Sequence, residues 1–101
     1  MTDDLRFEPE SVTVKPGGTV IWENIGSVGH TITAYADGIP DGAPYFASGG
    51  FDSEQAARQN VTEGLIGAGE TFKHTFEQSG IYEYFCIPHE SSGMTGSIQV
   101  K

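Results

Sequence analysis

The chain's only cysteine lies in a short segment that also holds a histidine and a methionine. The segment reads YFCIPHESSGM, and Cys86, His89 and Met94 are spaced C-x2-H-x4-M. A thiolate, an imidazole and a thioether form a soft to borderline donor set, which favours copper, Cu(I) in particular, over hard ions. Calcium and magnesium require several oxygen ligands, and structural zinc sites usually combine two or more cysteines. The donor set therefore indicates copper.

Each of these residues, taken singly, has an ordinary structural explanation. A lone inward-facing cysteine is usually an inert core residue, and a lone methionine usually fills space. Their combination favours copper binding, but a trigonal site of one cysteine and two histidines needs a second imidazole. His30 follows a glycine-rich loop and begins an alternating segment, which makes it the natural candidate. His74 lies between Lys73 and Thr75 without a soft neighbour, and we expect it on the surface.

The rest of the chain predicts short strands separated by turns. Polar and apolar residues alternate in the segments that we expect to be strands, which are 11–14, 19–23, 30–34, 71–76, 81–86 and 96–100. The turn at 15–18 has the proline and glycine of a type II turn. Between 35 and 69 the alternation is lost, and only 52–59 predicts a short helix. This pattern indicates an antiparallel β-sandwich or barrel.

The strand at 81–86 sets the direction in which the cysteine points. Successive side chains of a strand lie on opposite faces, and a charged side chain such as Glu83 belongs in water. Phe85 shares the face of Glu83 and is expected on the outside, whereas Tyr84 and Cys86 point inward. In the last strand the apolar positions at 98 and 100 are expected to point inward as well.

The chain is strongly acidic, with 14 Asp and Glu against 5 Lys and Arg and a net charge of -9. Such a surface repels nucleic acid and anionic lipid, so neither is expected as a partner. Acidity suits a protein that works in high salt, and equally one whose charge merely keeps it dissolved. The length of 101 residues predicts one domain, without a membrane-spanning stretch or an opening signal peptide.

Three segments, KPGGTVIWEN, GHTIT and GIYEYFCIPHESSGMTGSIQV, resemble the small blue copper proteins, or cupredoxins, and most closely the plastocyanin-like halocyanins of halophilic archaea. The resemblance covers residues 12–34 and 69–100. It implies an all-β, antiparallel Greek-key sandwich of eight strands with one short helix in the middle loop region, as a single copper-binding domain over residues 1–101. It further implies a type 1 site, in which one copper ion is held by four residues: His30, Cys86, His89 and, as a weak axial donor, Met94.

The resemblance also implies details around this site. The backbone N–H of Thr31 is expected to donate to the sulfur of Cys86. Asn24 either ties the two ligand loops together or is a plain turn residue. His89 is expected to expose its ring edge through an apolar patch, with Glu90 adding negative charge at the rim.

The implied function is electron transfer by a mononuclear copper site that cycles between Cu(II) and Cu(I). Redox proteins, such as a membrane electron-transport complex or a terminal oxidase, are the implied partners. The implied location is the outer or periplasmic side of the cytoplasmic membrane, with any lipid anchor upstream of this chain. Plant-type plastocyanins have a tyrosine directly before the cysteine, whereas this chain has Phe85, so their acidic-patch docking route is not expected here.

An electron carrier has three alternatives: an enzyme, a copper carrier or store, and a purely structural sandwich, which would survive loss of Cys86 without a change in any property. An enzyme is not expected, because copper oxidases and nitrite reductases need a second catalytic metal and more than the three histidines present. A binuclear copper centre would need two bridging cysteines. A copper carrier or store without redox shuttling remains the alternative function.

Overall fold

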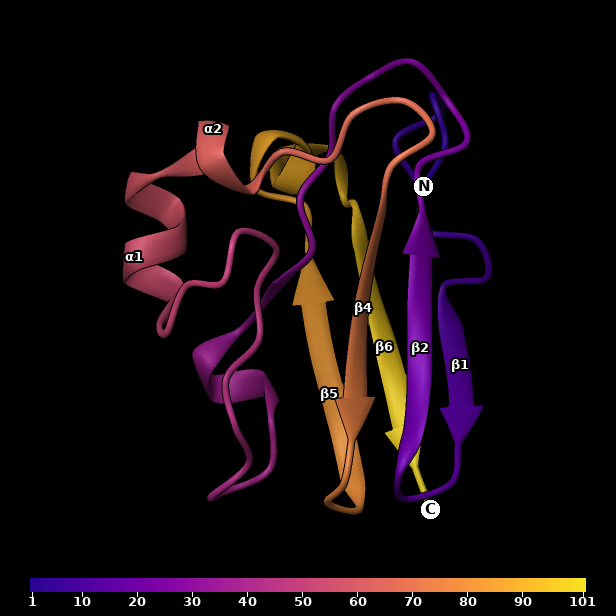
Figure 1. Ribbon diagram of the computed structural model, residues 1–101, viewed down its shortest axis with the longest axis vertical. Helices are drawn as coiled ribbons and strands as arrows, with labels where there is room; N and C mark the ends of the chain where they lie inside the picture. The colour runs from indigo at the N-terminus through magenta and orange to yellow at the C-terminus, as the bar shows by residue number, and fades with distance from the viewer.

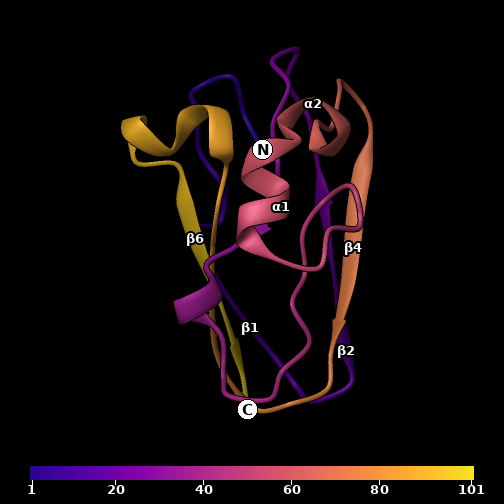
Figure 2. The same cartoon turned by 90° about the vertical axis from the view of Figure 1, so that its left-hand side faces the viewer.

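The computed structural model describes residues 1–101 as two β-sheets packed face to face (Figures 1 and 2). The larger sheet has the strand order β1-β6-β5-β3, and the smaller sheet pairs β2 with β4. The strands are β1 (Ser11–Val14), β2 (Gly18–Glu23), β3 (Thr33–Ala34), β4 (Thr71–Phe76), β5 (Gly80–Phe85) and β6 (Thr95–Val100). The predicted all-β sandwich is confirmed.

The turn between β1 and β2 has the predicted glycine chemistry. Gly17 has φ of 87°, in the left-handed region that side chains other than glycine rarely adopt. The N–H of Gly18 donates to the carbonyl of Lys15 at 2.9 Å, which closes the turn.

The sandwich has fewer regular strands than the eight that the resemblance implies. Of the predicted strand at 30–34, only β3 is regular, and His30 pairs with Ile66 through an isolated bridge. The segment at 35–53 contains two prolines and four glycines, which interrupt ladders because proline lacks an N–H and glycine is weak in strands. β1 and β6 pair in parallel, not antiparallel as predicted, and no hairpin joins these two strands to impose a direction.

Four short helical pieces complete the fold: η1 (Ala36–Gly38), α1 (Glu54–Gln59), α2 (Val61–Gly64) and η2 (Ile87–Ser92). The predicted helix at 52–59 corresponds to α1, which begins later because Ser53 is its N-cap and accepts a hydrogen bond from the N–H of Ala56 at 3.1 Å. α1 lies on the side of the sandwich where β3 is the edge strand of the larger sheet, and Figure 2 shows it in front of the space between the two sheets. None of these helices has the apolar length that crossing a bilayer requires.

The core between the sheets is built around Trp22, whose ring contacts four aromatic rings at centroid separations of 5.4 to 6.4 Å: Phe46, Phe72, Phe76 and Tyr84. Tyr84 and the last strand's Ile98 and Val100 are buried, as the alternation predicted. Large aromatic rings bury much apolar area, and two of these contacts, with Phe76 and Tyr84, are edge-to-face, so this cluster stabilises the packing of one sheet on the other.

Phe85 was predicted to face water, and the structure corrects this prediction, because the side chain is completely buried. The ring of Tyr35 stacks on it at 4.3 Å, and the guanidinium carbon of Arg58 lies 4.4 Å from its centroid. Glu83, on the same face of β5, is exposed. The alternation was therefore right, but residues before η1 and in α1 cover the end of this face.

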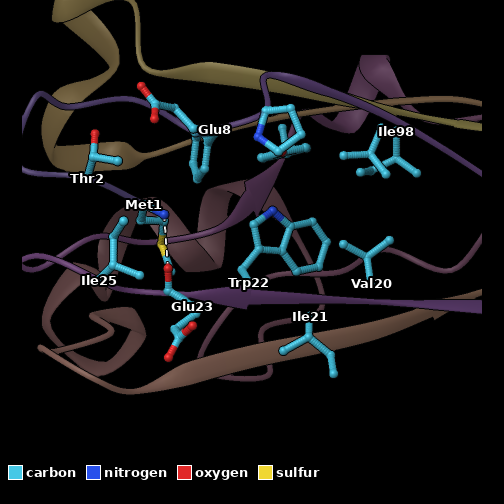
Figure 3. Close-up of a pocket in the computed structure, with 13 residues that line it drawn as sticks. Met1, Thr2, Glu8, Val20, Ile21, Trp22, Glu23, Ile25 and Ile98 are labelled. Carbon is cyan, nitrogen blue, oxygen red and sulfur yellow. Dashed lines mark hydrogen bonds between the residues drawn. The ribbon is translucent and has the colours of Figure 1, made fainter.

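The N-terminal segment closes the side of the sandwich next to β1 and β2. Met1 is buried, and its amino group donates to the carbonyl of Glu23 at 2.9 Å (Figure 3). A mainly apolar hollow lies beside Trp22 on this side and is lined by Val20 and Ile98, among others (Figure 3). The hollow contains none of the four candidate ligands.

Candidate metal centre

The two predicted ligand loops meet at one end of the sandwich, where the yellow-orange helix η2 lies at the top of Figure 1. Cys86 directly follows β5, His89 lies in η2, and His30 precedes β3. The Sγ of Cys86 is 3.8 Å from Nδ1 of His30 and 3.3 Å from Nδ1 of His89. The candidate ligand atoms of these three residues all lie within 4.8 Å of one another. Residues 56 positions apart in the sequence thus form one cluster.

Met94 belongs to the same loop and is buried, with only 1% of its surface exposed. Backbone hydrogen bonds close the loop on itself: the N–H of Cys86 donates to the carbonyl of Met94 at 3.0 Å, and the N–H of Met94 donates to the carbonyl of His89 at 3.3 Å. Gly93, with φ of 83°, ends η2 and turns the chain back into β6. The loop therefore places its thioether under the same end of the sandwich as its thiol and imidazole.

The thiol of Cys86 is fully buried, and this burial raises its pKa. The backbone N–H of Thr31 lies 3.4 Å from the sulfur and acts in the opposite direction, because it favours the thiolate. The predicted contact between Thr31 and the sulfur is confirmed. A bound metal ion would supply the positive charge that a buried thiolate lacks.

The two imidazoles differ in exposure. His30 is fully buried, and desolvation together with the nearby His89 lowers its pKa, which favours the neutral form that binds metals. Its Nε2 is buried without a hydrogen-bond partner, so packing holds the ring. His89 is only partly buried, and the two ring centroids are 5.1 Å apart.

Thr31, not Asn24, joins the two ligand loops. The hydroxyl of Thr31 accepts a hydrogen bond from the N–H of Ile87 at 2.9 Å, across the two loops. Asn24 is buried, and its Nδ2 donates to the carbonyls of Val28 and Ile66 at 2.8 Å each. Asn24 therefore ties the His30 loop to the segment before β4. A threonine in an alternating segment is ordinary, so the sequence carried no signal for this role.

Glu90 lies at the rim beside His89, as expected, and the structure shows that its negative charge is paired. Its carboxylate accepts hydrogen bonds from both terminal nitrogens of Arg58, at 2.9 and 3.2 Å, and from the hydroxyl of Tyr35 at 2.8 Å. Arg58 lowers the pKa of Glu90. Burial and Glu90 together raise the pKa of Tyr35 to about 12. The rim beside His89 therefore carries a paired charge.

His74 lies outside the cluster, as predicted, but it is not fully exposed. Its ring is partly buried and stacks on Phe46, with the centroids 4.7 Å apart. Burial lowers the pKa of His74. The sequence did not show this packing, because Phe46 lies in a segment without regular alternation.

The spacing of the three donor atoms fits a single transition-metal ion. Typical bonds of about 2.3 Å to sulfur and about 2.0 Å to nitrogen, in a trigonal arrangement, would separate the two donors by about 3.7 Å. The observed separations of 3.3 and 3.8 Å bracket this value. One sulfur, two imidazole nitrogens and a thioether in the same loop are the donor set of a type 1 copper site. The fold and this donor set define the class: a cupredoxin with one type 1 copper site.

Comparison with known proteins gives the family. Residues 1–101 match the family described as copper binding proteins, plastocyanin/azurin family, and the chain belongs to this family. It is 37% identical to plastocyanin from Scenedesmus fuscus over 97 residues, which covers 96% of this chain and 88% of the relative. It is 34% identical to plastocyanin from Dryopteris crassirhizoma, over 97% of this chain and 90% of the relative. It spans 59% of the chloroplastic plastocyanin of Tetradesmus obliquus, at 33% identity.

Solved structures agree with this assignment. A mutant fern plastocyanin superposes with a TM-score of 0.68 at 29% identity, covering 95% of this chain and 88% of the other. A purple cupredoxin from Nitrosopumilus maritimus superposes with a TM-score of 0.63 at 26% identity, covering 93% of this chain and 80% of the other. The chain is therefore a plastocyanin-like type 1 copper electron carrier, and not an enzyme.

Proposed function

We propose that residues 1–101 form one domain that carries single electrons between redox proteins outside the cytoplasmic membrane, with its copper ion held by His30, Cys86, His89 and Met94. The observation that carries this proposal is the convergence of Cys86 Sγ with two Nδ1 atoms from distant loops. Bound copper supplies the one-electron couple of Cu(II) and Cu(I). The protein supplies the donors, their spacing and the route to the surface.

The scaffold holds these donors in a fixed arrangement. Cys86 and Met94 are joined through their backbones at 3.0 Å, and Thr31 bonds both to the sulfur of Cys86 and to the backbone of Ile87. A site whose donors are held before the metal binds needs little rearrangement when the charge of the site changes. Small rearrangement favours fast electron transfer.

His89 is the route by which electrons reach the surface, because it is the one partly exposed residue among the four. The loops at this end carry exposed apolar side chains: Ile25 (71% exposed) and Val28 (36%) in the loop before His30, and Leu65 (42%) next to Ile66, which bridges to His30. Met94 is buried and does not contribute to this surface. A small apolar patch beside the redox centre suits a brief encounter with a partner.

The partners and the cellular setting belong to the same proposal. A net charge of -9 would steer the protein toward a positively charged docking surface, with an association rate that falls as salt rises. A membrane electron-transport complex or a terminal oxidase with such a docking surface would be a suitable partner. The closer likeness to halocyanins, and a halophilic origin, are supported by the quoted motifs and by the excess of acidic residues.

Titration of the metal-free protein with a cupric salt tests the function. We expect one equivalent to give an intensely blue adduct that ascorbate bleaches and an oxidant restores. A carrier or store would exchange its metal readily and lack the intense blue colour, and a zinc or Cu(I) store would be colourless. His74→Ala is the matched control, because it removes a histidine outside the cluster, and we expect it to keep the colour. A wild-type protein without a coloured one-to-one adduct would refute the proposal.

A further inference from the structure

We propose that Arg58 is a positioning residue for the copper site, acting from α1 on the chain neighbours of two ligands. Phe85 directly precedes Cys86, and Glu90 directly follows His89. Arg58 contacts both Phe85 and Glu90. The inference rests on the proposed function, because positioning matters only if these ligands hold a metal.

All three nitrogens of the Arg58 guanidinium donate hydrogen bonds, and one of its faces packs on an aromatic ring. Its Nε lies 2.8 Å from Glu54 within α1, and its two terminal nitrogens bind the two carboxylate oxygens of Glu90. Such a two-pronged pair fixes the direction of the carboxylate as well as its distance. Its flat face lies over the buried ring of Phe85, with 4.4 Å from the guanidinium carbon to the ring centroid.

Tyr35 completes the same cluster. Its hydroxyl donates to Glu90 at 2.8 Å, and its ring stacks on Phe85 at 4.3 Å. Glu90 is thus held by two side chains, and the same two side chains cover Phe85. The last residue of β5 and the middle of η2 are therefore tied to one rigid group, with Cys86 and His89 between them.

Stabilisation of the fold does not account for this arrangement. The side chains of Arg58 and Glu90 are 37% and 33% exposed, and ion pairs of that exposure add little to global stability. Arg58 already has a partner in its own helix, Glu54, four residues away. The bond from Arg58 to Glu90, which lies 32 positions further along the chain, joins α1 to the ligand loop. The effect of the contact is therefore local to the metal-binding loop.

Two consequences follow for the site. Without Arg58 the ligand loop should open more often, because Glu90 and Phe85 lose a shared contact. The carboxylates of Glu54 and Glu90 would also be left without their cation. Uncompensated negative charge near the site favours the more positive oxidised state, and so lowers the reduction potential.

The experiment compares Arg58→Gln, Arg58→Lys and the double variant Arg58→Gln/Glu90→Gln with wild type. Lys73→Gln is the matched control, since it removes one exposed positive charge from β4, away from the cluster. Two quantities are measured: amide hydrogen exchange at His89 and Met94 in the metal-free protein, and the reduction potential of the copper-loaded protein.

We expect Arg58→Gln to speed exchange at these amides roughly fivefold and to lower the potential, while Lys73→Gln leaves exchange unchanged and moves the potential less. Arg58→Lys keeps the charge but not the two-pronged geometry, so exchange should rise while the potential stays near wild type. In the double variant the potential should return toward wild type while exchange stays fast.

Arg58 is not a positioning residue if Arg58→Gln matches Lys73→Gln in both measurements. The inference is also overturned if only the potential responds, since that would reduce Arg58 to a charge. The exchange measurement needs no copper, so it separates this inference from the proposed function. A protein that never turns blue refutes the function, whereas a blue protein with an indifferent Arg58 refutes only the positioning role.

Discussion

At Cys86, burial and hydrogen-bond donors act on one sulfur in opposite directions. Burial raises the pKa of the thiol, and the N–H of Thr31 offsets part of that effect. The metal-free protein should therefore carry a protonated thiol at neutral pH, and metal uptake should release its proton. The same N–H donor then withdraws electron density from the thiolate, which is one way in which a protein tunes a type 1 site.

Met94→Leu tests the axial role that we propose for the thioether. The substitution conserves volume and hydrophobicity, so the buried position should be filled at a cost below about 1.5 kcal/mol. The blue colour should persist, because the sulfur of Cys86 and both imidazoles remain. The reduction potential should rise, because loss of a donor disfavours Cu(II). Protein-film voltammetry measures this, and an unchanged potential would remove Met94 from the ligand set.

Thr31→Val tests the link between the two ligand loops. The variant keeps the β-branched shape but leaves the N–H of Ile87 and the hydroxyl of Thr33 without their partner, which should cost about 1–3 kcal/mol in the free energy of unfolding. Urea unfolding of the metal-free protein measures the loss. The control is Thr19→Val, which removes an exposed hydroxyl pair with Thr75 and should change stability by less than about 0.5 kcal/mol. Equal losses in both variants would mean that the loop link contributes nothing.

At the scale of elements, the loop before His30 depends on the N-terminal segment. The carboxylate of Asp3 accepts hydrogen bonds from the N–H groups of Val28 and Ser27, at 3.0 and 2.8 Å. The bond from Val28 has the larger effect and that from Ser27 the smaller, and together they lower the pKa of Asp3 below its ordinary value of 3.8. A segment remote from the ligands in sequence thus helps to shape the His30 loop.

This contact predicts a dependence of stability on pH. Because the pKa of Asp3 is lower in the folded protein, its carboxylate contributes stability above the ordinary value, and the contribution is lost as pH falls through the folded pKa. Asp3→Asn keeps an acceptor oxygen but removes the charge. The stability difference between wild type and variant should be constant near neutral pH and shrink below about pH 4.

Chemical unfolding at a series of pH values measures that difference. The effect should be small, because Asp3 is exposed and solvent screens its charge. A difference that grows on acidification would have the wrong sign and would contradict the assigned role of the carboxylate.

At the scale of the whole molecule, most of the negative charge is unpaired. The sequence has 14 acidic residues, and both salt bridges in the structure share Arg58. Unpaired like charges on a small protein repel one another and destabilise the compact state. Added salt shortens the range of that repulsion to a few ångströms at molar concentration.

We therefore expect the melting temperature of the metal-free protein to rise between about 0.1 M and 1 M KCl, over the range in which screening becomes strong. Differential scanning calorimetry measures it. NaCl at the same ionic strength is the comparison, because it screens equally well and should give the same rise. A melting temperature that is flat in KCl would show that the acidic surface serves solubility only, and would weaken the proposed halophilic origin.

The strands that flank the site were predictable because the signal for a strand is local. Alternation over six residues correctly placed Tyr84 and Cys86 inward, since side chains in a strand must alternate between faces. Alternation could not predict that Phe85 is buried, because the residues that cover it, Tyr35 and Arg58, lie 50 and 27 positions away. For the same reason the sequence left open whether Asn24 joins the ligand loops.

The sequence by itself determined the donor chemistry. Three soft or borderline ligands within nine residues indicated one metal site, and the position of His30 after a glycine-rich loop made it the natural second imidazole. Tertiary structure decided what surrounds them: the hydroxyl that joins the loops, the cation that pairs with Glu90 and the depth at which each ring is buried. Ligand type is a property of single residues, whereas charge pairing and burial depend on which distant segments the fold brings into contact.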